Sequence, residues 1–371
     1  MRNYNIRLSL MFCLAAAVTL SVYAQNPTLK DAFKGHFYIG AAINEGQISG
    51  KSKDGALLIE QFNSITPENC MKWERIHPKA NEYNFAMSDS FVALGQRNKM
   101  FIIGHCMVWH SQVPRWVFQD SLGQPVTREV LLQRMHDHII TVMGRYKGRV
   151  NGYDVVNEAL NDDGTMRKSR WTQIIGDDFI EKAFEYAKEA DPNAELYYND
   201  YNIEQPAKCQ GAIKIIKNLQ AKGIKITAVG IQGHYHMDIP SLKEIDESIA
   251  EFTKLGLKVM FTELDINVLP RPEELKGADV SQNFELKKNQ NPYPESLPDS
   301  VQQKLADRYA DFFKIFLKYK SVSRVTFWGV EDGQSWLNGW PIRGRTNYPL
   351  VFDRKLQPKP AFYSIIKTVG K

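Results

Sequence analysis

Short apolar runs alternate with longer amphipathic stretches along most of this chain. The apolar runs have the length and bulky composition typical of buried strands. They predict strands at His36–Ala42, Ser64–Thr66, Met100–His105, Val150–Val156, Ala194–Tyr198, Ile226–Ile231, Lys258–Thr262 and Arg324–Trp328. Helical periodicity between them is clearest at Phe91–Asn98, Arg128–Tyr146, Asp178–Ala190, Pro206–Lys222, Ser241–Leu255 and Val301–Lys318.

Strands that alternate with helices in this way predict a single (β/α)8 TIM barrel, which we assign to residues 25–371. Ser241, followed three positions later by Glu244, predicts a capping box at the start of one helix. No glycine-rich phosphate loop follows an early strand, which disfavours an open nucleotide-binding sheet. Residues 267–299 form one long irregular stretch rich in proline, and a loop of that length in a compact domain usually has a function.

The first 24 residues have the features of a secretory signal peptide. Arg2 and Arg7 precede an apolar run that ends at Ala24, where we predict cleavage. The run is short for a transmembrane helix, so we expect a secreted or periplasmic protein with no membrane attachment after cleavage.

Composition adds little beyond a globular chain. It has 371 residues, of which 43% are hydrophobic and 24% are charged, with a net charge of +5 and no long basic run. This distribution gives no support for nucleic-acid binding. Cys70, Cys106 and Cys209 remain after cleavage, an odd number that predicts at least one thiol without an intramolecular disulfide. We expect a monomer.

Two glutamates at the ends of apolar runs are the main indication of chemistry. Glu158 follows one predicted strand and Glu263 follows another. Carboxylates are costly to bury without partners, so acids at these positions are either structural, held by a lysine or arginine, or functional. The strands of such a barrel present their carboxyl ends to one site, where two carboxyl groups could cleave a glycosidic bond.

The residues that follow the other predicted strands favour a sugar as the ligand. They offer amides, imidazoles and indoles, which can bind hydroxyl groups and stack on pyranose rings. A tryptophan taken alone is more often part of a core than a sugar platform. Trp336 is the better candidate for a sugar platform because the residues around it are typical of an exposed loop.

Five motifs in order give the chain a family resemblance. They are TPENCMKW (residues 66–73), GHCMVWHSQ (104–112), DVVNE (154–158), TELD (262–265) and FWGVEDGQSW (327–336). Together they resemble the strand-end motifs of family 10 glycoside hydrolases, the endo-β-1,4-xylanases, over essentially the whole mature chain. The resemblance implies hydrolysis of xylan and xylo-oligosaccharides with retention of configuration and without a cofactor.

The resemblance also implies roles for individual residues. Glu158 matches the acid/base, Glu263 the nucleophile, Asn157 the residue that holds the sugar 2-hydroxyl, and His234 with Asp265 the pair that keeps the nucleophile ionised. Further positions match residues that line the subsites on the non-reducing side of the cut: Glu68, Asn69, Lys72, His105, Trp109, Gln112, Gln232, Trp328 and Trp336. Tyr201, after the fifth predicted strand, completes the predicted substrate-binding set.

Three positions depart from the family pattern. Cys70 and Cys106 lie beside predicted substrate-binding residues, and Tyr153 replaces a more usual tryptophan.

Three alternative functions also remain open on the sequence. A metal hydrolase would need ligands such as His136 and His138, but these two point to different faces of one helix, and we predict no metal. The others are a barrel glycosidase acting on another polysaccharide and a non-catalytic sugar-binding barrel.

Overall fold

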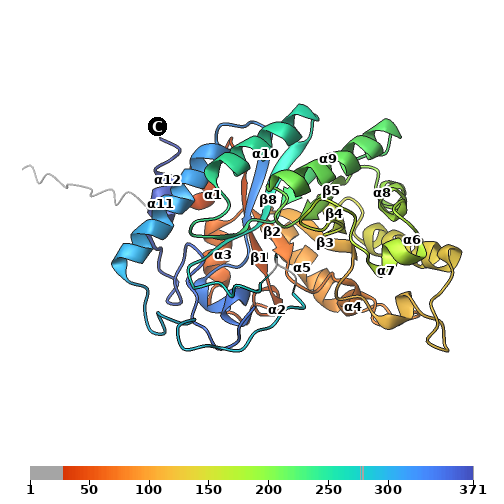
Figure 1. Ribbon diagram of the computed structural model, residues 1–371, viewed down its shortest axis with the longest axis horizontal. Helices are drawn as coiled ribbons and strands as arrows, with labels where there is room; N and C mark the ends of the chain where they lie inside the picture. The colour runs from red at the N-terminus through yellow and green to blue at the C-terminus, as the bar shows by residue number, and fades with distance from the viewer. Residues whose placement is uncertain (1–27, 276, 278–279, 371) are drawn as a thin grey trace, which may run out of the picture.

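A closed parallel barrel forms the centre of the molecule (Figure 1). The computed structural model describes residues 28–275, 277 and 280–370, so the predicted signal peptide and its cleavage site lie outside the described residues. Within that part of the chain the barrel strands are β1 (Tyr38–Ile43), β2 (Ser64–Pro67), β3 (Phe101–Trp109), β4 (Gly152–Asn157), β5 (Glu195–Asp200), β6 (Ala228–Ile231), β8 (Lys258–Asn267) and β9 (Val322–Phe327). Each pairs in parallel with the next, and the pairings of β1 with β9 and of β6 with β8 close the barrel. The (β/α)8 prediction is therefore confirmed.

Helices surround the barrel and cover the outward faces of its strands (Figure 1). The longer ones are α5 (Ala86–Arg97), α6 (Arg128–Arg145), α8 (Phe179–Ala190), α9 (Pro206–Ala221), α10 (Leu242–Lys254) and α11 (Asp299–Phe316). Shorter helices are α1 (Leu29–Ala32), α2 (Glu45–Ile48), α3 (Gly55–Gln61), α4 (Trp73–Ile76), α7 (Arg170–Ile174) and α12 (Pro360–Ile366). Near the C-terminus, α12 packs against α11 and α1.

Several local predictions can be compared directly with the structure. The capping box at Ser241 is present: its hydroxyl accepts from the Glu244 amide, and the Glu244 carboxylate accepts from the Ser241 amide. The short helices α1 to α4 were not predicted, because pieces of four to seven residues carry too little periodicity. Between Asn267 and Asp299 the described residues contain no helix or named strand, as the proline-rich sequence indicates.

The interior of the barrel is filled by side chains. Tyr153 on β4 is fully buried and lies over Gly104 on β3, where a Cβ atom would come within 2.2 Å of the tyrosine ring. A glycine is therefore required at position 104 to make room for the aromatic side chain at position 153. The departure from the family pattern at Tyr153 is thus a matter of core packing below the site.

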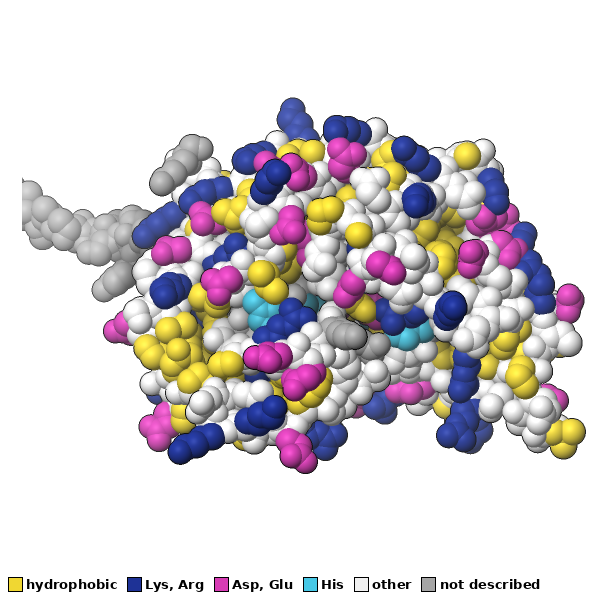
Figure 2. All heavy atoms as spheres, in the orientation of Figure 1, with side chains coloured by type: hydrophobic (Ala, Val, Ile, Leu, Met, Phe, Trp, Pro, Cys, Tyr) yellow, Lys and Arg dark blue, Asp and Glu magenta, His cyan; other side chains and the backbone are white. Residues whose placement is uncertain are grey.

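The face of the molecule shown in Figure 2 carries side chains of both charges. Acidic and basic side chains are interspersed over the face shown in Figure 2. Within residues 28–275, 277 and 280–370, no helix combines the length and hydropathy needed to cross a bilayer.

Candidate active site

Glu158 is placed by the end of β4. It follows Asn157, the last residue of that strand, and its backbone takes a left-handed conformation with φ of +56°. Such a conformation is unfavourable for a residue with a Cβ atom and occurs mostly at functional sites. The Glu158 amide donates to the Asn199 carbonyl at 2.9 Å, which fixes this turn against β5.

Neutral donors bind the Glu158 carboxyl group, which is only 5% exposed, and the His110 imidazole lies 3.9 Å from it. Trp109 Nε1 donates to one oxygen at 2.9 Å, and Gln232 Nε2 donates to the other at 2.9 Å. Burial raises the pKa of Glu158, and the nearby negative charge of Glu263 adds to this shift, while the bonds from Gln232 and Trp109 oppose it. This environment favours a carboxyl group that can hold a proton.

Glu263 lies inside a strand, which corrects the sequence prediction. We expected the strand to end at Thr262, but β8 continues to Asn267, with an irregular register against β9 between Phe261 and Leu264. The reason is the short strand β7 (His234–His236), which was not predicted and which pairs with the second half of β8. This pairing places His234 directly opposite Asp265.

A histidine–aspartate pair holds the Glu263 carboxylate. His234 lies 3.2 Å from Glu263 through Nε2 and 3.0 Å from Asp265 through Nδ1. Burial opposes a charge on His234, but the two carboxylates outweigh it and raise the pKa of His234 to about 10. Burial alone would likewise raise the pKa of Glu263, but the hydrogen bond from His234 and the bond from Asn199 contribute to a net lowering.

Amide side chains connect the two acids. Asn199 donates to Glu263 at 2.9 Å and to Asn157 Oδ1 at 2.9 Å. Gln232 donates to Glu158 at 2.9 Å and to the same Asn157 oxygen at 3.4 Å. The role of Asn199 was not predicted, although it stands at a strand end like the other site residues. A buried amide that links Glu263 to Asn157, the neighbour of Glu158, is visible only once the strands are assembled.

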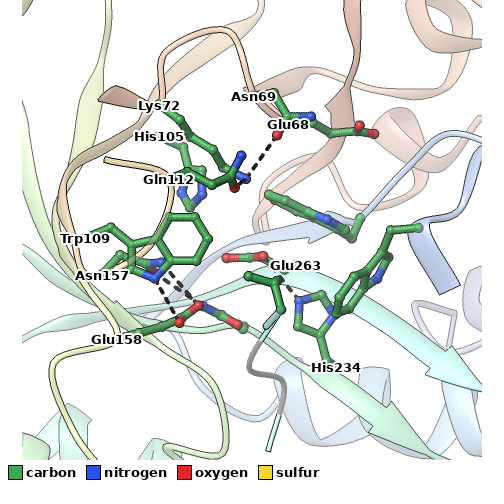
Figure 3. Close-up of a pocket in the computed structure, with 14 residues that line it drawn as sticks. Glu68, Asn69, Lys72, His105, Trp109, Gln112, Asn157, Glu158, His234 and Glu263 are labelled. Atoms are coloured by element: carbon green, nitrogen blue, oxygen red, sulfur yellow. Dashed lines mark hydrogen bonds and ion pairs between the residues drawn. The ribbon is translucent and has the colours of Figure 1, made fainter. Parts of the chain in front are cut away.

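Both acids open into one pocket of about 190 Å³ (Figure 3). Lys72 crosses its wall, donating to Gln112 at 2.9 Å and to Asn69 at 3.2 Å, with its ammonium 5.0 Å from the Trp109 ring centroid. The pocket is lined by Glu68, Asn69, Lys72, His105, Trp109, Gln112, Asn157, Glu158, Gln232, His234, Glu263, Val280, Trp328 and Trp336. Of these, only Val280 was absent from the predicted set.

Two predicted site residues do not line this pocket. Asp265 lies behind His234 and also accepts from Trp336 Nε1 at 2.7 Å, so it supports both side chains. Tyr201 is only 5% exposed: the Lys208 ammonium lies 3.5 Å from its ring centroid, and its hydroxyl accepts from Arg167. Gly277 covers another part of the same ring. Tyr201 therefore supports the site from behind in this structure.

Comparisons with known proteins agree with this geometry. The family model of glycosyl hydrolase family 10 matches residues 28–368. The chain belongs to glycosyl hydrolase family 10. Endo-1,4-beta-xylanase A of Xylanibacter ruminicola is 47% identical over 96% of this chain and 98% of that protein.

Solved structures of the family have the same barrel. An endoxylanase retrieved from a sugarcane soil metagenome is 47% identical with a TM-score of 0.89, covering 91% of this chain and 99% of the other. An intracellular xylanase of Thermoanaerobacterium saccharolyticum, solved as a mutant in complex with xylotetraose, is 35% identical with a TM-score of 0.80, covering 92% and 98%.

The remaining candidates for chemistry in this family 10 chain lie outside the pocket. Cys70, Cys106 and Cys209 are all free and buried. His136 faces Glu189, and His138 stacks on Trp73 with ring centroids 3.7 Å apart. Among the described residues, no group of three or more histidine, cysteine or acidic side chains is arranged to hold a metal ion.

Proposed function

We propose that this chain is a retaining endo-1,4-β-xylanase that hydrolyses internal bonds of xylan. The observation that carries the proposal is the contrast between the two glutamates in one pocket of a family 10 barrel. Burial raises the pKa of Glu158, whereas the His234–Asp265 pair lowers that of Glu263. A protonated acid beside a permanent carboxylate is the pairing that double displacement requires.

In the first step Glu263 attacks the anomeric carbon while Glu158 protonates the departing oxygen. The glycosidic bond breaks, and a covalent bond forms between the sugar and the Glu263 carboxylate. Trp109 and Gln232 each donate to one oxygen of the Glu158 carboxyl group, which holds it in the pocket. The part of the sugar chain on the reducing side of the cut, now protonated on its departing oxygen, then leaves.

In the second step Glu158, now a carboxylate, removes a proton from water, and the resulting nucleophile displaces Glu263 from the sugar. The product keeps the anomeric configuration of the substrate, and both glutamates return to their starting states. Asn157 supports this chemistry by binding the 2-hydroxyl of the sugar between the acids. Its amide oxygen is held by Asn199 and Gln232, which fixes the side chain in the pocket.

The remaining pocket residues bind the sugars on the non-reducing side. Lys72, Gln112 and Asn69 form a hydrogen-bonded group that offers donors and acceptors to hydroxyls, and Trp328 and Trp336 offer aromatic surface. The family resemblance implies that tryptophan and glutamine side chains here exclude the hydroxymethyl group of glucose, which favours xylose. The predicted signal peptide supports export of the enzyme to its polymeric substrate.

One product analysis tests substrate, mode of attack and stereochemistry together. Glucuronoxylan and arabinoxylan should give a ladder of oligosaccharides early in the reaction, and NMR should detect the β-anomer first. Equal or faster hydrolysis of cellulose or mannan would reject the substrate assignment. Initial release of the α-anomer would reject the retaining mechanism and leave the family unaffected.

A further inference from the structure

The residues after β9 carry Trp336 into the catalytic pocket. They form two short 3₁₀ turns, Asp332–Gln334 and Trp336–Asn338, which we call the Trp336 turns. The Trp336 indole lines the pocket and donates to Asp265 Oδ2 at 2.7 Å. Its ring centroid lies 4.7 Å from that of His234. The orientation of this indole in the pocket therefore depends on what holds the two turns in place.

Asp332, at the start of the Trp336 turns, is fully buried and attaches them to the last part of the chain. Its Oδ1 accepts from the Leu350 amide at 2.8 Å, and its backbone amide donates to the Phe352 carbonyl at 3.0 Å. Its backbone carbonyl accepts from the side chain of Asn338, in the second turn, at 2.8 Å. Both turns are therefore connected to this one residue.

A buried ammonium group completes the attachment. Lys359, which directly precedes helix α12, is only 3% exposed. Its Nζ donates to Asp332 Oδ2 at 2.9 Å and to the carbonyls of Tyr348 and Leu350 at 2.7 Å each. An ammonium group has three hydrogens, so all the donors of Lys359 are used and its position is fixed. Within the described part of the chain, this is the only ion pair that residues 331–340 form.

Burial determines what happens when one member of this ion pair is lost. Burial raises the pKa of Asp332 to about 6, although the Lys359 ammonium opposes the rise. Without the ammonium, the pKa of Asp332 would rise further, and the carboxyl group would take up a proton rather than remain an unpaired buried charge. The fold can then form, but the charge-assisted bond from residue 359 to Asp332 is gone. The Trp336 turns thereby lose one of their strongest attachments.

We propose that Lys359 is a positioning residue for Trp336: its bond to Asp332 holds the Trp336 turns so that the indole faces the sugar-binding pocket. The proposal rests on the xylanase function proposed above, which gives the indole a sugar to contact. Lys359 does not line the pocket itself and acts only through the turns. It therefore affects substrate binding more than the chemical steps at the two glutamates.

A double-mutant cycle tests whether Lys359 acts through Trp336. Lys359→Met keeps the length of the side chain and removes the ammonium, and Trp336→Ala removes the indole. Each should raise the KM for xylohexaose about three- to tenfold, the range expected for one aromatic contact, with a smaller change in kcat. The KM of the double variant should equal that of Trp336→Ala alone, because no indole is left to position.

A matched control separates positioning from a general loss of stability. Ile365 is fully buried in helix α12 and makes no bond to Asp332. Ile365→Ala should lower the melting temperature through the cavity it leaves, yet keep the KM for xylohexaose unchanged. If Lys359→Met does not fold, Asp332→Asn takes its place in the cycle. The asparagine oxygen still accepts from Lys359 but carries no charge, so KM should rise less, by about twofold, and again add nothing to Trp336→Ala.

Three results would overturn the proposal. One is a KM in Lys359→Met that is unchanged, or changed no more than in Ile365→Ala at the same loss of melting temperature. Another is a fall in kcat at constant KM. The third is a double variant whose loss equals the product of the two single losses. Failure of the xylanase function itself gives a different result, because the unaltered protein would then not cleave xylohexaose.

Discussion

The surroundings of Glu158 and Glu263 differ in one respect that separates their chemistry. The two carboxyl groups are equally buried, each 5% exposed, and each accepts a bond from an amide side chain. Glu158 receives its other strong bond from an indole, whereas Glu263 faces an imidazole that Asp265 keeps charged. With a neutral donor, the rise in pKa caused by burial remains dominant, whereas a charged donor turns that rise into a lowering. The charged His234 is therefore one main reason why Glu263 is ionised while Glu158 can carry the proton.

Loss of Glu263, the proposed nucleophile, should have the largest effect. In Glu263→Ala no covalent intermediate can form, so xylan hydrolysis should fall by about four orders of magnitude or more. Xylohexaose binding, measured by calorimetry, should stay close to normal because the other pocket residues remain. Near-normal turnover in this variant would assign the nucleophile to another residue.

The effect of losing Glu158, the proposed acid/base, should depend on the leaving group. Glu158→Ala should slow xylan hydrolysis by about 10²- to 10⁴-fold, the usual contribution of general acid catalysis. Aryl xylobiosides with activated leaving groups need little protonation, so glycosylation of the enzyme by them should be much less affected. Pre-steady-state kinetics measures that step separately, and equal losses with both substrates would contradict the assignment.

Replacing His234, the charged donor, should bring the pKa values of Glu158 and Glu263 closer together. In His234→Asn the pKa of Glu263 should rise, because a cation is lost and Asp265 is left as a nearby anion. The acidic limb of kcat/KM should then move to higher pH, with a loss of about 10²-fold at the optimum. An unchanged acidic limb would show that His234 does not set the charge of Glu263.

The same variant also tests the charge on His234 through stability. The pKa of His234 is raised from 6.5 to about 10, so its charge stabilises the fold fully below pH 6.5. That contribution is lost as the pH rises from 6.5 through about 10. Urea denaturation should show this decline in the unaltered protein and a flatter profile in His234→Asn.

Removing a neutral donor should have the smallest effect. Trp109→Phe deletes the bond to Glu158 that holds its pKa down, so the basic limb of kcat/KM should move to higher pH by less than one unit. The acidic limb should stay in place, in contrast to His234→Asn. A shift of the acidic limb instead would reverse the roles of the two acids.

Most of the barrel was predictable because each strand is a local apolar run with a helix after it. Glu158, Glu263 and most pocket residues could be placed because parallel strands bring their carboxyl ends together. The extension of β8 and the strand β7 depend on pairing between distant segments, which a local pattern does not contain. For the same reason the sequence indicated neither the bridging role of Asn199 nor the burial of Tyr201 beneath Lys208 and Gly277.

The left-handed backbone of Glu158 has a consequence for the stability of the whole protein. The fold holds Glu158 at an unfavourable φ. It also buries the Glu158 carboxyl group and raises its pKa, so ionisation of this group lowers the free energy of unfolding at pH values above the ordinary pKa of a glutamate. Replacement by glycine removes both costs. Glu158→Gly should therefore unfold at a higher temperature than the unaltered enzyme, and also than Glu158→Ala. At this residue the fold thus gives up stability that the proposed chemistry requires.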